Sequence, residues 1–177
     1  MPRALVVFES MFGNTYKVAK AIADGLASQT PVELVEVGDA PTTIGDDVSL
    51  LVVGGPTHAF GMSRQGTRQT ASEQAEERLV STGIGLREWL GALDPASHKA
   101  AVATFDTVLA KPRWVSRIGT AARQAEKQLR RRGLRIAAPA ESFYVTDTSG
   151  PLVAGEQERA HKWGEKLGSE HVAAQPQ

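Results

Sequence analysis

Short apolar runs alternate with stretches of helical periodicity along the whole chain. Segments of strand length cover residues 4–8, 32–37, 48–55, 99–105 and 134–145, the last of which is interrupted near Pro139. Between and after them, apolar residues recur at helical spacing in residues 18–26, 71–80, 86–93, 116–132 and 156–171. This alternation predicts an α/β fold in three layers, a doubly wound parallel sheet of five strands with helices on both faces.

The first strand leads into a helix through a tight turn of small and hydroxyl-bearing residues, 10–15. In such a layout the backbone N–H groups at the start of the helix, together with its dipole, favour an anion. Ser10 and Thr15 place a hydroxyl at each end of the turn. Because the turn contains no lysine or arginine, we expect the anion to be held mainly by neutral donors.

Length and composition indicate one domain. The chain has 177 residues, of which 41% are hydrophobic and 23% charged, as is usual for a soluble globular protein. We expect the domain to cover residues 1–172 and residues 173–177 to form a disordered tail. The sequence has no cysteine, which excludes disulfides, thiol catalysis and iron–sulfur clusters. It shows neither a signal peptide nor a membrane-spanning run, so a cytoplasmic protein is expected.

Charge is unevenly distributed although the formal net charge is zero. The first sixty residues lean acidic, whereas the segment 111–135 is strongly basic. Since no aromatic residues interleave with the arginines of the helix predicted within it, residues 116–132, nucleic acid is not the expected partner. The segment is either a solvated face or a docking face for an acidic protein, in which case Arg113, Arg117 and Arg123 are the candidate contacts.

The turn Ser10-Met-Phe-Gly-Asn-Thr15 resembles the phosphate-binding loop of flavodoxins, Ser/Thr-x-Thr-Gly-x-Thr. Ser10, Gly13 and Thr15 match the pattern, while Phe12 stands where flavodoxins usually have a third hydroxyl. The resemblance implies FMN as cofactor and the strand order 2-1-3-4-5, with the ligand at the carboxyl ends of the strands. It also implies that the whole turn binds the phosphate, namely Ser10, Met11, Phe12, Gly13, Asn14 and Thr15.

Two further loops are expected at the flavin ring. The loop after the third strand resembles that of flavodoxin-like quinone reductases, and the residues expected to contact the ring there are Pro56, Thr57, His58, Ala59, Phe60 and Gly61. Gly54 and Gly55 would allow close backbone approach. His58 would donate a proton to a reduced quinone, form a pH-sensitive hydrogen bond to the flavin, or be solvated or hydrogen-bonded locally.

The third loop has neither the stacking aromatic of flavodoxins nor the glycine-rich loop of the quinone reductases. Phe105, Asp106 and Thr107 are expected to touch the ring, with Phe105 alternatively a core residue at the end of its strand. The long connection after the third strand carries Arg64 and Arg68 and is a candidate for a lid or for the site of a second substrate or partner.

The resemblance implies an FMN-binding redox protein, and we expect electron transfer between protein partners because no nicotinamide site is recognisable. One alternative is an FMN-dependent NAD(P)H:quinone oxidoreductase. An alternative of another class is a flavin-free module that binds partners through its basic face. No catalytic residue is assigned, since no serine lies in a nucleophile elbow. No metal is expected, because His98, His161 and His171 lack ligand spacing.

Overall fold

The computed structural model describes residues 2–58, 61–74, 79–94, 99–110 and 119–175. Within these ranges the strands are β1 (Arg3–Phe8), β2 (Val32–Glu36), β3 (Val48–His58), β4 (Gly61–Met62), β5 (Ala101–Leu109), β6 (Arg135–Ile136) and β7 (Glu141–Val145). The helices are α1 (Asn14–Leu26), α2 (Gln65–Gln74), α3 (Leu86–Ala92), α4 (Ala121–Arg131) and α5 (Glu156–Ala173).

The sheet has the predicted order. Its path is β2-β1-β3-β5-β6, and β7 also pairs with β5 further along that strand. All of these pairings are parallel. Since β5 is the fourth predicted strand and β6 and β7 are the two parts of the fifth, the expected order 2-1-3-4-5 is confirmed. One strand that was not predicted is β4, which folds back and pairs antiparallel with the end of β3.

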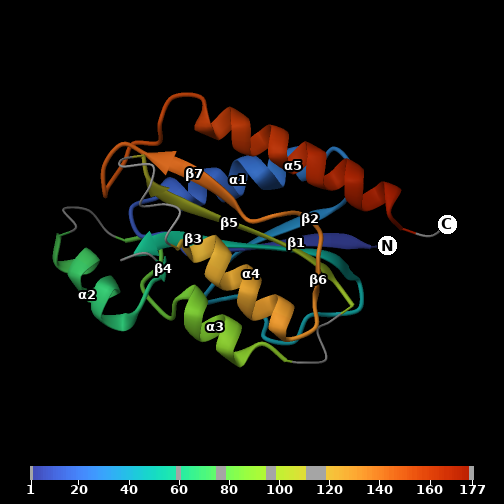
Figure 1. Ribbon diagram of the computed structural model, residues 1–177, viewed down its shortest axis with the longest axis horizontal. Helices are drawn as coiled ribbons and strands as arrows, with labels where there is room; N and C mark the ends of the chain where they lie inside the picture. Colours follow the sequence, from blue (N-terminus) through green and yellow to red (C-terminus); the bar gives the residue numbers. More distant parts are fainter. Residues whose placement is uncertain (1, 59–60, 75–78, 95–98, 111–118, 176–177) are drawn as a thin grey trace.

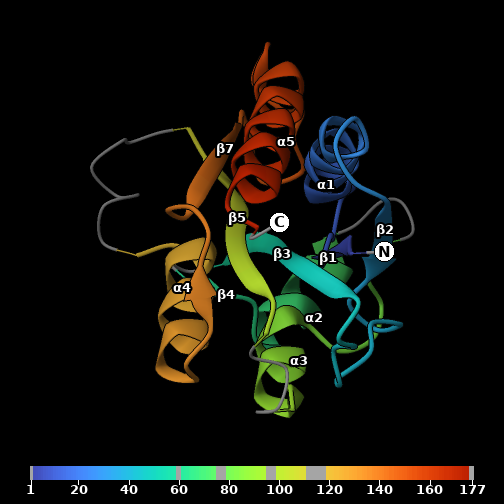
Figure 2. The ribbon, with the colours of Figure 1, turned by 90° about the vertical axis from the view of Figure 1, so that its right-hand side faces the viewer.

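Helices cover both faces of the sheet (Figure 1). In the view turned by 90°, α1 and α5 again lie on one side and α3 and α4 on the other (Figure 2). Successive side chains of a strand point to opposite faces. Accordingly, Leu5 and Val7 of β1 join the core beneath α3 and α4, whereas Ala4 and Val6 join the core beneath α1 and α5. None of the described helices is long and apolar enough to cross a membrane.

Several elements differ from the prediction in their bounds. β5 continues to Leu109, because it stays paired with β3 as far as Thr107 and with β7 to its own end. The helix predicted from residue 71 is α2, which already begins at Gln65. At its start the Thr67 hydroxyl accepts the N–H of Arg64, a local cap that hydrophobic periodicity does not report. α5 extends through Ala173, which the sequence had assigned to the tail.

Candidate functional site

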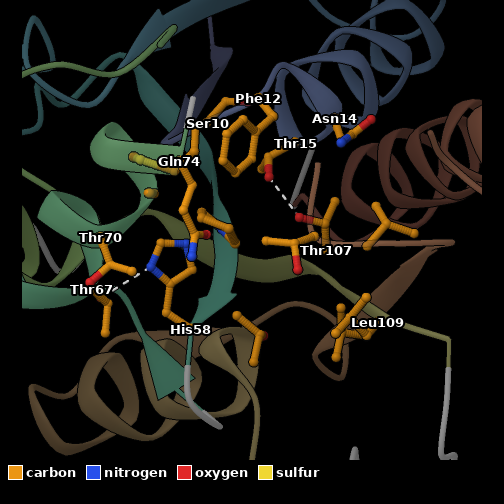
Figure 3. Close-up of a pocket in the computed structure, with 17 residues that line it drawn as sticks. Ser10, Phe12, Asn14, Thr15, His58, Thr67, Thr70, Gln74, Thr107 and Leu109 are labelled. Atoms are coloured by element: carbon orange, nitrogen blue, oxygen red, sulfur yellow. Dashed lines mark hydrogen bonds between the residues drawn. The ribbon is translucent and has the colours of Figure 1, made fainter. Parts of the chain in front are cut away.

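A cavity of about 320 Å³ opens at the carboxyl edge of the sheet, where the loop after β1 and the last residues of β3 and β5 meet α2 (Figure 3). Open sheets of this kind bind ligands at that edge. The residues that line it are Ser10, Met11, Phe12, Asn14, Thr15, Pro56, Thr57, His58, Thr67, Thr70, Ala71, Gln74, Thr107, Val108, Leu109, Val145 and Thr148.

The loop after β1 is shaped around the side chain of Ser10. This side chain is fully buried, and its Oγ accepts the N–H groups of Gly13 and Tyr16, each at 3.2 Å. A hydroxyl has two lone pairs and one proton, so the proton is what Ser10 can still offer to a ligand. Gly13 precedes α1 with φ +92°, a left-handed conformation that glycine adopts without strain.

The start of α1 supplies further donors. The N–H groups of Asn14 and Thr15 lie in the first turn, where no helical carbonyl can accept them. The hydroxyls of Thr15 and Thr107 are 2.7 Å apart and share a hydrogen bond (Figure 3). Two hydroxyls carry two protons and this bond uses one, so the other is available to a group in the cavity.

Neutral donors therefore dominate the end of the cavity beside α1. None of the lining residues in the described part of the chain is a lysine or arginine. Backbone N–H groups, hydroxyl protons and the positive end of the helix dipole suit a phosphate. The chemistry of these donors is compatible with the phosphate end of FMN.

Most of the predicted residues are brought together here. Nine of them line the cavity: Ser10, Met11, Phe12, Asn14, Thr15, Pro56, Thr57, His58 and Thr107. Gly13 shapes the loop without lining the cavity. Ala59 and Phe60 lie outside the described residues. Gly61, Phe105 and Asp106 do not line it.

Phe105 is a core residue instead of a ring contact. It is fully buried in the cluster beneath α1 and α5. Its ring lies against Gly54, where an added Cβ would come within 2.2 Å of a ring carbon. Gly54 thus makes room for a core side chain and not, as expected from the sequence, for a ligand. The reason is that β5 continues four residues past Phe105, so only the later residues reach the edge.

Asp106 points away from the cavity, toward the start of α4. It is fully buried, and its Oδ2 accepts the N–H of Ala122 at 2.8 Å and the hydroxyl of Thr57 at 3.2 Å. Burial raises the pKa of Asp106. The Thr57 hydroxyl also accepts the N–H of Ala121 at 3.0 Å. Asp106 and Thr57 therefore join the cavity wall to α4. Gly61 is similarly buried in β4, against the Gln124 side chain.

α2 provides a cavity wall that sequence reasoning missed. Thr67, Thr70, Ala71 and Gln74 line the cavity at the spacing i, i+3, i+4, i+7, which describes one face of a helix. That spacing could have shown that they share a face, but the face is too polar to stand out by periodicity. The other wall residues that were missed are Val108, Leu109, Val145 and Thr148.

His58 is half-buried and extends from the end of β3 into the cavity (Figure 3). Its Nδ1 atom lies 3.1 Å from the Thr67 hydroxyl. Burial, together with the positive charge of Arg68, lowers the pKa of His58 below its ordinary value. Its imidazole is consequently neutral near pH 7.

A second buried carboxyl, that of Glu9, contacts the residues just before α2 and at the start of α3. Glu9, directly before the loop, accepts the hydroxyl of Ser63 and, at 2.6 Å, the N–H of Leu86. It is fully buried, and burial raises its pKa. Arg68 donates to the same Ser63 hydroxyl and forms an ion pair with Glu88 of α3 at 2.5 Å. These contacts link the start of α2 to the loop after β1 and to α3, and they include Arg68, one of the two arginines that the sequence placed in a candidate lid or partner site.

Comparisons with known proteins agree with this geometry. A model of the flavodoxin family matches residues 6–163. A flavodoxin from the domain Archaea is 18% identical, with 96% of this chain and 99% of that one covered and a TM-score of 0.61. A Streptococcus pneumoniae flavodoxin is 15% identical, covering 96% and 97%, with a TM-score of 0.62.

Larger proteins contain the same fold. Rubredoxin oxygen:oxidoreductase from Desulfovibrio gigas is 12% identical, and the match covers 97% of this chain but 36% of that one, with a TM-score of 0.62. No curated protein gives a significant match. At such low identities the solved structures show the fold, while the family match extends over most of the sequence. The chain therefore belongs to the flavodoxin family.

Proposed function

We propose that the protein binds FMN non-covalently and transfers electrons between protein partners. The observation that carries the proposal is the set of neutral donors around Ser10 and Thr15, at the edge where parallel sheets bind their ligands. Bound FMN would supply the redox chemistry, and the protein would supply binding, orientation and electrostatics.

Different residues of the chain would hold the phosphate and the ring of FMN. The Ser10 and Thr15 hydroxyls and the N–H groups at the start of α1 would hold the phosphate. Pro56, Thr57 and His58 on one side, and Thr107 with its neighbours on the other, would flank the ring. Leu109 lines the cavity and is 45% exposed, so the site has an apolar rim within reach of a partner. An electron carrier needs such an accessible edge.

The basic segment is the proposed docking face. α4 begins beside Thr57, and its Arg123, Lys127 and Arg130 are exposed. Arg113 and Arg117 lie outside the described residues. Positive charge near the cavity would steer an acidic redox protein toward it.

One observation favours a second candidate, an NAD(P)H:quinone oxidoreductase. Thr70 and Gln74 line the cavity from α2 yet remain exposed, so this wall has polar side chains available for a small substrate. Rapid, saturable oxidation of NAD(P)H by quinones with the FMN-loaded protein would support this candidate over the carrier.

The direct test is ligand identity and affinity. Protein purified from cells should be yellow, acid extraction should release FMN identified by mass, and apoprotein should bind FMN with a 1:1 end point. Recovery of FAD, or no saturable binding of FMN to the apoprotein, would refute the proposal.

A further inference from the structure

The hydrogen bonds of Thr67 bear on which ring nitrogen of its neighbour His58 carries the proton. The Thr67 hydroxyl accepts the N–H of Arg64 at 2.9 Å and lies 3.0 Å from the carbonyl oxygen of Arg64, to which it donates. Its third contact is Nδ1 of His58 at 3.1 Å. A hydroxyl has one proton, and here the Arg64 carbonyl takes it.

Counting the bonds then assigns the tautomer. If Nδ1 carries the ring proton, the hydroxyl accepts from Arg64 and from His58 and donates to the carbonyl, so three hydrogen bonds form. If Nδ1 carries no proton, the Thr67 hydroxyl must donate to it, and its hydrogen bond to the Arg64 carbonyl is lost. The arrangement with three bonds places the proton on Nδ1 and leaves Nε2 of His58 unprotonated.

The unprotonated Nε2 is available to the cavity. His58 lines the cavity with its imidazole among the other wall residues (Figure 3). The hydrogen bond that the His58 ring makes within the described part of the chain is the one through Nδ1. A neutral imidazole whose second nitrogen has a free lone pair can accept a proton.

From this geometry we propose that His58 is the proton acceptor of the site, taking a proton from solvent onto Nε2 when electrons enter the bound flavin. The inference rests on the proposed function. The electrons come from a redox partner protein or, in the test, from dithionite. The proton becomes the second N–H of an imidazolium, and its positive charge balances one negative charge gained by the flavin. No bond of the protein is broken.

The charges around His58 allow this response. On α2, Arg68 opposes protonation, but its ion pair with Glu88 of α3 offsets part of its charge. Two buried carboxyls, Glu9 after β1 and Asp106 on β5, do not line the cavity, and burial raises the pKa of both. α4 contributes the neutral Gln124 to the adjoining β4. Among the described residues no carboxylate contacts the imidazole, so a new negative charge in the cavity should raise the pKa of His58.

Nitrogen NMR of ¹⁵N-histidine-labelled protein tests each step. In the apoprotein the His58 ring should show the Nδ1–H tautomer. In FMN-loaded protein, its titration midpoint should rise by about one to three pH units when dithionite reduces the flavin, the effect expected of an opposite charge within about 6 Å. His171, whose ring bonds Ser49 at the opposite end of β3 from His58, serves as the internal control, and its signal should not change on reduction.

Two matched variants separate the tautomer from general packing. Thr67→Val should remove the preference for Nδ1–H, whereas Thr70→Val, the same change on the same helix face, should leave it. An Nε2–H tautomer in the unaltered apoprotein, or an equal His58 midpoint in oxidised and reduced protein, overturns the inference alone. Failure to bind FMN would overturn the proposed function as well, and the apoprotein spectrum would still report the tautomer.

Discussion

The hydroxyl oxygens of Thr15 and Thr107 lie 2.7 Å apart in the interior, although 92 residues separate them in the chain. Thr15 is in the first turn of α1 and Thr107 is near the end of β5. Both are buried, with 2% and 5% of their surfaces exposed. The bond joins the end of the cavity beside α1 to the strand that forms its opposite wall, so the two sides are positioned before a ligand arrives.

We predict that the double change Ser10→Ala and Thr15→Val weakens FMN binding far more than riboflavin binding. Each lost hydrogen bond to a charged group costs about 1.5–3 kcal/mol, or roughly tenfold or more in affinity. Riboflavin has no phosphate and should be affected little. Fluorescence titration with both flavins measures the difference, and Ser169→Ala on α5 is the matched control. An equal loss for both flavins would contradict the assigned role.

Gly13→Ala should destabilise the fold through the backbone alone. An added Cβ meets nothing within 4 Å at Gly13, but φ is +92°, a region that costs an L-residue about 1–2 kcal/mol. Gly91 in α3 also has open space and no positive φ, so Gly91→Ala should stabilise by about 0.5–1 kcal/mol. Urea unfolding of both variants compares them. Equal shifts in the same direction would argue against a conformational requirement at Gly13.

Glu9→Gln should change how stability depends on pH. The pKa of Glu9 is raised in the folded state, so the folded protein holds its proton more tightly than the unfolded chain does. The free energy of unfolding relative to Glu9→Gln should therefore be greatest at low pH. It should fall as pH rises above about 4.3, the unperturbed value, and level off beyond the raised folded pKa.

The control variant is Glu88→Gln, because the stability that Glu88 contributes should change with pH in the opposite direction to that of Glu9. The pKa of Glu88 is lowered, with burial opposing its hydrogen bond to Arg68, so its contribution is present at neutral pH and lost as pH falls through the folded pKa. Urea unfolding between about pH 2.5 and pH 8 of the protein, Glu9→Gln and Glu88→Gln shows both trends. A difference between the protein and Glu9→Gln that does not vary with pH would disprove the burial of an ionisable Glu9.

Arg159→Met should loosen the attachment of α5 to the sheet. The guanidinium donates to Glu156 at 2.8 Å and to the carbonyl of Ser142, and it lies 4.3 Å from the centre of the Phe143 ring. Loss of these contacts should lower the free energy of unfolding by about 2–3 kcal/mol. Arg130→Met breaks an exposed pair with Glu126 and should cost less than about 0.5 kcal/mol. Similar losses in both would show that Arg159 is no more than a surface ion pair.

Charge reversal of Arg113, Arg117 and Arg123 to glutamate should slow electron transfer from an acidic partner without altering FMN affinity. The rate in the unaltered protein should also fall as salt rises, since exposed charges are screened over about 8 Å at physiological ionic strength. Stopped-flow reduction by candidate reductases measures it. Reversal of Lys162 and Lys166, exposed on α5, is the matched control. Rates that respond to neither salt nor charge reversal would leave the basic segment without a docking role.

Local patterns determined the fold and one end of the site. The alternation of apolar runs and helical spacing was enough for the parallel sheet and its order, because side-chain periodicity reflects which face each residue buries. The loop from Ser10 to Thr15 was recognisable for a similar reason. Its donors, its glycine and the following helix are consecutive in the chain, so their geometry follows from local conformation.

Only the tertiary structure decided the other walls. Which of Phe105 and Thr107 reaches the cavity depends on where β5 ends. Pairing with β3 and β7 sets that end. The bond between His58 and Thr67, and the burial of Glu9 behind α2, depend on how a polar helix packs at the sheet edge. Contacts between distant residues arise from strand register and packing, and neither leaves a periodic trace in the sequence.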